Sequence, residues 1–297
     1  MSIFIQVMLP VLIILVLGYG LQKWKSLDIK PLSTVAIYIF TPMLIFQNVY
    51  SADLNNDYLT LVVFSLLLMI LMIIITKIYT KIRNAKSSTE SGLILSTAFM
   101  NSGNYGAPIV LFAYGEVAFD YAVSLLVIHL IMMNSFGLYY AARGSGGIKV
   151  ALKALLEMPP TYAALLAIFM NSFNLQMPTN LMLMVDLLAP ATIPLVMLIL
   201  GMQLANISLK NFSIELLSFA IITRLFLSPL LAFIILYFIQ VDPLIEKILI
   251  LIAAMPSAAN TVIYAVQYDS EPELVSSITL ITTLLSIVTI TGLLWVL

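Results

Sequence analysis

Two short polar stretches interrupt long apolar runs of the sequence. They are residues 101–108 (NSGNYGAP) and residues 256–261 (PSAANT). Where a helix restarts after such a break, its first N–H groups have no partner, and that end of the helix carries roughly half a positive charge. Two such ends that meet could hold an anion without lysine or arginine. We therefore predict an anion site that has no basic residue near either break.

The residue types in the breaks fit this chemistry. Side-chain amides and hydroxyls donate hydrogen bonds without a formal charge, glycine permits tight backbone turns, and proline suits the first turn of a new helix. A single glycine or proline kink in an apolar helix is more often a packing device. Two kinks that each carry asparagine favour a binding site instead. The residues that we expect to contact a bound molecule are Asn101, Asn104, Tyr105, Gly106, Pro108, Ser257, Asn260 and Thr261.

Two ionisable residues within apolar runs are candidates for coupling or gating, Arg224 and His129. An ionisable side chain inside a membrane span is by default a functional candidate. For Arg224 the structural alternative is ion pairing, or an extended side chain that reaches the membrane surface. For His129 the alternative is a buried neutral ring bonded to a carbonyl group. The chain has no cysteine and a single histidine, so we expect no metal site, no cofactor and no catalytic residues.

The composition requires a membrane for most of the chain. Of its 297 residues, 62% are apolar and only 9% are charged, against roughly 45–50% and about 25% in soluble domains. The net charge of −1 provides no basic surface for nucleic acid. We predict a multi-pass protein of the cell (inner or plasma) membrane that is not an enzyme.

Ten apolar runs are long enough to be membrane-spanning helices. Eleven of the thirteen Lys and Arg residues lie in the odd-numbered loops between them, which predicts that those loops face the cytoplasm and that both termini lie outside. The predicted spans cover residues 2–21, 31–52, 58–77, 88–115, 119–142, 149–171, 181–207, 213–240, 246–268 and 272–296.

The two broken spans are the fourth and the ninth, which hold the same position in two sets of five. Residues 1–142 would form the first repeat, 143–148 a glycine-rich linker, and 149–297 the second repeat. Because five is odd, the second repeat would be inverted in the membrane. The predicted fold is all-α, with ten transmembrane helices in two inverted repeats and with helices 4 and 9 crossing near the midplane.

Several motifs resemble the auxin efflux carrier family, which includes bacterial organic-acid permeases and the plant PIN-type carriers. The likeness covers all ten predicted spans, and its fairly specific part is the stretch 101–115. At the position of the second crossover proline of PIN-type carriers this chain has Thr261, and Pro256 stands five residues earlier. The other matching stretches are residues 193–204 (IPLVMLILGMQL), 223–229 (TRLFLSP), 255–260 (MPSAAN) with Tyr268, and 273–278 (ELVSSI).

The resemblance implies a fold like that of bile-acid symporters. Helices 1, 2, 6 and 7 would form a scaffold domain, and helices 3–5 and 8–10 a transport domain with the crossing. Asn101 matches the asparagine that contacts substrate in the family, and Pro108 matches its first crossover proline.

We expect an alternating-access, elevator-type transporter of small organic anions, auxin-like or malate-like carboxylates. It would be secondary active or driven by the membrane potential. The alternatives are a sodium-coupled importer of the bile-acid symporter type and a channel or membrane sensor. The expected partners are the organic anion and membrane lipid, with a homodimer through the scaffold domain left open.

Overall fold

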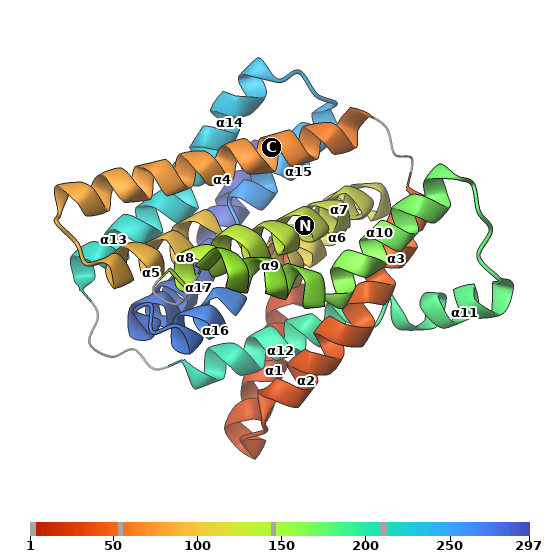
Figure 1. The fold of residues 1–297 in the computed structure, drawn as a ribbon, viewed down its shortest axis with the longest axis horizontal. Helices are drawn as coiled ribbons and strands as arrows, with labels where there is room; N and C mark the ends of the chain where they lie inside the picture. Colours follow the sequence, from red (N-terminus) through yellow and green to blue (C-terminus); the bar gives the residue numbers. More distant parts are fainter. Residues whose placement is uncertain (1–3, 53–55, 144–146, 208–212) are drawn as a thin grey trace.

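The protein is helical along almost all of the residues that the structure describes (Figure 1). The computed structural model describes residues 4–52, 56–143, 147–207 and 213–297. Within these residues, seven helical stretches are apolar and long enough to cross a membrane, which confirms the expected all-α membrane protein at that level. They are Phe4–Lys25, Ile29–Ser51, Asp57–Ile82, Glu116–Ala141, Thr179–Asn206, Ile214–Phe238 and Pro272–Val296.

The other three predicted spans, residues 88–115, 149–171 and 246–268, are each divided into shorter helices. Some long helices also contain a wider π-helical turn, labelled η. In chain order the elements are η1 (Phe4–Met8), α1 (Leu9–Lys25), α2 (Ile29–Val35), η2 (Ala36–Phe40), α3 (Thr41–Ser51), α4 (Asn56–Ile82), α5 (Ser87–Ala98), η3 (Ser102–Gly106), α6 (Ala107–Tyr114), α7 (Glu116–Met132), η4 (Met133–Gly137), α8 (Leu138–Ala141), α9 (Gly147–Glu157), α10 (Pro159–Ser172), α11 (Thr179–Leu188), α12 (Thr192–Asn206), α13 (Ile214–Ile222), η5 (Thr223–Leu227), α14 (Ser228–Phe238), α15 (Pro243–Ala253), α16 (Asn260–Gln267) and α17 (Pro272–Val296).

Proline explains most of the wide turns. A proline has no N–H to donate, and its ring collides with the carbonyl group four residues earlier. One extra residue in the preceding turn relieves that collision without ending the helix. Of the five wide turns in the described chain, four end two residues before a proline, namely Pro10, Pro42, Pro108 and Pro229.

The first break is therefore shorter than the sequence indicates. We expected the interruption over residues 101–108, but only residues 99–101 between α5 and η3 are non-helical. The wide turn accommodates Pro108, so the helix restarts at Ser102. The second break covers residues 254–259, between α15 and α16, and contains Pro256.

The predicted linker lies at a boundary of the described chain. Residues 144–146 of that linker fall outside the described residues, as does Lys210, one of the loop lysines. The helix α9 begins at Gly147, and the expected single span 149–171 is divided between α9 and α10 on either side of Met158.

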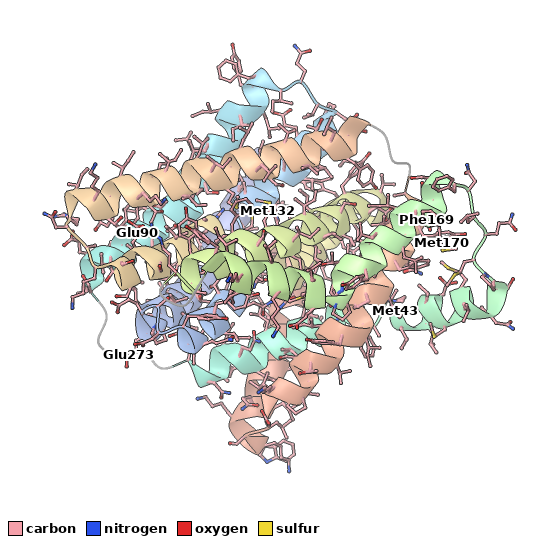
Figure 2. The ribbon with its side chains drawn as sticks, in the orientation of Figure 1. Met43, Glu90, Met132, Phe169, Met170 and Glu273 are labelled. Carbon is pink, nitrogen blue, oxygen red and sulfur yellow. The ribbon has the colours of Figure 1, made fainter. Side chains whose placement is uncertain are left out.

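Large apolar side chains cover much of the outside of the bundle. The side chains of Leu17, Leu187 and Tyr237 are 60%, 77% and 83% exposed. Figure 2 shows the labelled Phe169 and Met170 on α10, which packs against α3. In water such a surface would aggregate, whereas in a bilayer it faces lipid.

Helices α1 and α12 touch backbone to backbone through two glycines. A Cβ atom added at Gly18 would lie 2.2 Å from the carbonyl oxygen of Leu198, and one added at Gly201 would lie 2.1 Å from that of Leu15. Small residues allow such close approach between membrane helices. The α1–α12 pair is therefore tightly fixed.

The replacement Gly201→Ala should destabilise the protein by roughly 1–3 kcal/mol, because the new methyl group overlaps a backbone oxygen that cannot move away alone. The measurement is the midpoint of thermal unfolding in detergent. Gly20→Ala on α1 is the matched control, since no atom of the described residues lies within 4 Å of the added Cβ. Equal midpoints for the two variants would contradict the close contact.

Candidate functional site

The two breaks lie against each other and pair, at a place that we call the crossing. The N–H of Asn101 donates to the carbonyl oxygen of Pro256 at 2.8 Å, and the N–H of Ala258 donates to that of Phe99 at 3.0 Å. Met100 and Ser257 thus face each other as a single antiparallel bridge. An unpaired backbone group in a membrane interior costs several kcal/mol. Each break therefore satisfies backbone groups that the other leaves open.

Two helical segments start at this crossing. The η3–α6 segment starts at Ser102, and the carbonyl oxygen of Asn101 accepts from the N–H of Gly106 at 2.9 Å. The side chain of Asn101 makes no cap bond to this segment. The second helix, α16, starts at Asn260. The first N–H groups of a helix lack intrahelical acceptors and make its start electropositive.

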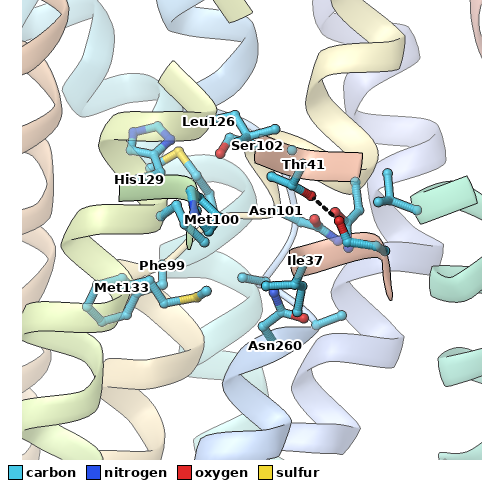
Figure 3. Close-up of a pocket in the computed structure, with 18 of the residues that line it drawn as sticks. Ile37, Thr41, Phe99, Met100, Asn101, Ser102, Leu126, His129, Met133 and Asn260 are labelled. Carbon is cyan, nitrogen blue, oxygen red and sulfur yellow. Dashed lines mark hydrogen bonds between the residues drawn. The ribbon is translucent and has the colours of Figure 1, made fainter. Parts of the chain in front are cut away.

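A cavity lies beside the two helix starts (Figure 3). Its volume is about 90 Å³, several times the roughly 10–15 Å³ that one water needs. Asn101, Ser102, Asn104 and Asn260 contribute polar groups from the crossing, and His129 contributes its ring from α7. In Figure 3, Asn101 is labelled near the centre of the drawn residues, and the His129 ring lies to its left.

Several buried polar atoms at this cavity have no hydrogen-bond partner among the described residues. They are Nδ2 of Asn101, both ring nitrogens of His129, and Oε1 of Gln203 on α12. Buried polar groups are nearly always bonded, and leaving one unbonded costs roughly 1–3 kcal/mol. Their convergence on one cavity is the arrangement expected where a polar ligand binds.

The opposite wall of the cavity is mostly apolar. Ile37 of η2, Leu44 of α3, and Ile193, Val196 and Ile199 of α12 line it. The described lining includes no Asp, Glu, Lys or Arg. Among the lining groups, attraction for an anion must therefore come from N–H groups and helix dipoles.

Arg224 corrects two of our expectations. Its side chain is fully buried, so it does not reach the membrane surface. Its Nη1 donates to the carbonyl oxygen of Thr97 at 2.8 Å, and its Nη2 donates to that of Ala253. These carbonyls belong to the ends of α5 and α15, which immediately precede the breaks. Contrary to our expectation, a basic residue therefore lies at the crossing. It lies on the side where α5 and α15 end.

The predicted site residues divide into two groups. Asn101, Asn104, Asn260 and His129 line the cavity. His129 also lacks the carbonyl partner that we considered for it, within the described chain.

The second group lies behind the cavity wall. The hydroxyl of Tyr105 bonds with that of Ser286 at 3.1 Å, and the hydroxyl of Thr261 donates to the carbonyl oxygen of Ala258 at 2.6 Å. The remaining members of this group are Gly106, Pro108 and Ser257, which are buried and do not line the cavity.

Sequence reasoning missed Gln203, Ser102 and the apolar wall. Gln203 had a usable signal, because it is an amide within the apolar run 193–204. The apolar wall had no such signal in the sequence, because Ile and Val occur both on helix faces that contact lipid and on faces that line a cavity.

Comparison with known sequences identifies the family. The sequence model of a family described as Membrane transport protein matches residues 3–294. The chain belongs to this membrane transport protein family. It is the auxin efflux carrier family that the motifs resemble.

Relatives in this family span nearly the whole chain. An uncharacterized transporter of Methanothermobacter thermautotrophicus is 30% identical over 96% of this chain and 95% of its own length. An uncharacterized transporter of Methanocaldococcus jannaschii is 30% identical over 98% of both chains. A Rhizobium meliloti protein with the name "Putative malonate transporter" is 27% identical over 89% of this chain and 85% of its own.

The absence of native cysteine makes the cavity of this membrane transport protein directly testable. The variant Asn104→Cys should react with a small water-soluble methanethiosulfonate, because Asn104 lines the cavity and is partly exposed. Ser257→Cys is the control and should stay unlabelled, since Ser257 is fully buried at the same crossing. The extent of labelling is measured by mass spectrometry of the folded protein. Faster labelling at position 257 would show that the cavity is placed wrongly.

Proposed function

We propose that this chain is a transporter of small organic anions, and that the carboxylate binds at the crossing of the two breaks. The observation that carries the proposal is the set of unpartnered buried groups at one cavity. Asn101 offers two amide N–H donors and His129 offers a ring N–H, and Nδ2 of Asn101 and both His129 nitrogens lack partners in the described chain. A carboxylate has two oxygens that would accept from these groups.

Electrostatics favours an anion over a cation or a neutral ligand. Two helix starts at the cavity together supply roughly one positive charge, and the described lining has no formal charge of either sign. A carboxylate also has an organic remainder, for which the apolar wall formed by Ile37, Val196 and Ile199 is suited. The Rhizobium relative with malonate in its name adds support for the class of substrate.

The packing supports two inverted repeats of five spans. Exchange of the repeats maps span 1 onto span 6 and span 7 onto span 2. The contact between α1 and α12, which belong to spans 1 and 7, then becomes a contact between α10 and α3. Both pairs pack closely, as this symmetry requires. The two breaks, in spans 4 and 9, exchange with each other in the same way.

The cavity lies between two groups of helices, which supports alternating access of the elevator type. One wall of the cavity is formed by α2, η2, α3, α10 and α12. The other wall is formed by the crossing and α7. We assign the first group to the expected scaffold domain and the second group to the expected transport domain. Movement of the second group past the first would carry the bound anion across the membrane. Outward movement down the membrane potential yields roughly 2.3 kcal/mol per charge per 100 mV.

Replacement of Asn101 by Ala should weaken anion binding about 10- to 150-fold, which corresponds to the roughly 1.5–3 kcal/mol of a hydrogen bond to a charged group. Binding is measured as the thermal stabilisation of purified protein by malonate, malate and indole-3-acetate. Flux of the stabilising anion into proteoliposomes should fall in parallel. Asn180→Ala, at an exposed position on α11, is the control. Wild-type binding and flux in the Asn101 variant would refute the proposed site.

Impermeant thiol labelling in intact cells tests the proposed orientation, in which both termini are extracytoplasmic. Gln240→Cys, between α14 and α15, should react from outside. Asn84→Cys, between α4 and α5, should react only after permeabilisation, because its loop carries Lys81, Arg83 and Lys86. Both positions are exposed. The reverse pattern would overturn the orientation and leave the anion site untouched.

A further inference from the structure

Arg224 is the largest side chain that is fully buried among the described residues. It belongs to η5, in the middle of the Ile214–Phe238 helix. In addition to the bonds from its guanidinium group to the carbonyl oxygens of Thr97 and Ala253, its Nη2 donates to the hydroxyl of Ser228. That hydroxyl in turn donates to the carbonyl oxygen of Ala253 at 2.8 Å. One guanidinium group therefore ties together three helices, α5, α15 and the one that carries it.

The positive charge of Arg224 is balanced by helix ends. Within the described chain no carboxylate lies within 4 Å of it. The ends of α5 and α15 each carry roughly half a negative charge, and Arg224 bonds to a carbonyl of each end. Together the two ends supply about one negative charge, which matches the single charge of a guanidinium group.

Backbone carbonyls at interrupted helices and at helix ends are also the groups that coordinate a sodium ion in many secondary transporters. Here N–H groups of Arg224 already bond the carbonyl oxygens of Thr97 and Ala253 and the hydroxyl oxygen of Ser228. A free cation would have to displace the guanidinium group of Arg224, which is covalently attached to the chain. The local concentration of the attached group makes that exchange unfavourable.

We propose that Arg224 is a built-in cation that replaces a dissociable coupling cation at the crossing. It holds the two negative helix ends together, so the helix starts on the other side of the breaks stay positioned for the anion. The consequence is transport that does not require sodium. The inference rests on the proposed function for its transport part, whereas its structural part concerns the ends of α5 and α15 alone. Arg224 is in this sense a positioning residue.

The structural part is tested with purified Arg224→Ala, whose shortened side chain leaves room for a free cation. The thermal midpoint should fall in this variant, and methylguanidinium should raise it more than equal concentrations of choline or urea do. Arg83→Ala is the matched control, because Arg83 forms a surface ion pair with Glu215 and is half exposed. Its midpoint should not respond to methylguanidinium. Equal responses of the two variants would overturn the inference.

Two further variants keep the test decisive if Arg224→Ala does not fold. Arg224→Met removes the charge but fills much of the volume, and Arg224→Lys keeps the charge but lacks the fork that reaches both carbonyls. We expect malonate flux to fall at least about ten-fold in the Met variant, because the two helix ends lose their counter-charge. The malonate flux of the Lys variant should lie between that of the Met variant and that of wild type. Wild-type flux and stability in Arg224→Met would overturn the inference.

The transport part is tested with wild-type protein in proteoliposomes. Malonate flux should be unchanged when choline replaces sodium on both sides. Malonate flux that requires sodium would overturn the inference that Arg224 replaces a coupling cation. The same result would still support the proposal of an organic-anion transporter. If wild type moves none of malonate, malate and indole-3-acetate, the proposed function fails. Rescue of Arg224→Ala by methylguanidinium in that case would still support the built-in cation.

Discussion

Two backbone breaks pair with each other in the interior of the helix bundle, and this pairing holds the fold together. Residues 99–101 and 254–259 leave the helical path, and their N–H and C=O groups cannot turn to water inside a bilayer. The bonds between Asn101 and Pro256 and between Ala258 and Phe99 satisfy groups of both breaks. Neither break is stable alone, so segments about 155 positions apart must fold against each other.

The crossing also separates charge. The helix ends of α5 and α15 meet on one side, where they bond to Arg224. The helix starts lie at the cavity with Asn101, whose Nδ2 has no partner in the described part of the chain. Because helix ends are negative and helix starts positive, the two sides have opposite electrostatic character. Burial intensifies this difference, since the surrounding dielectric is low.

Helix α12 shows how one element can serve two purposes. One face approaches α1 through Gly201, with no space for even a methyl group. Val196, Ile199 and Gln203 line the cavity instead. The close contact with α1 holds this wall of the cavity in place. The chain thus combines close packing, which resists deformation, with an open space that a ligand can fill.

Residue order alone predicts the membrane environment, most of the helices and the two interruptions, because these depend on local apolar content, glycine and proline. It also pointed to Asn101, Asn260 and His129. Three features are visible in the folded chain alone: the partners of Arg224, the shift of the first break to residues 99–101, and the inclusion of Gln203 in the cavity. These features depend on which groups from distant segments come together in the fold. The order of residues along a single helix does not specify those contacts.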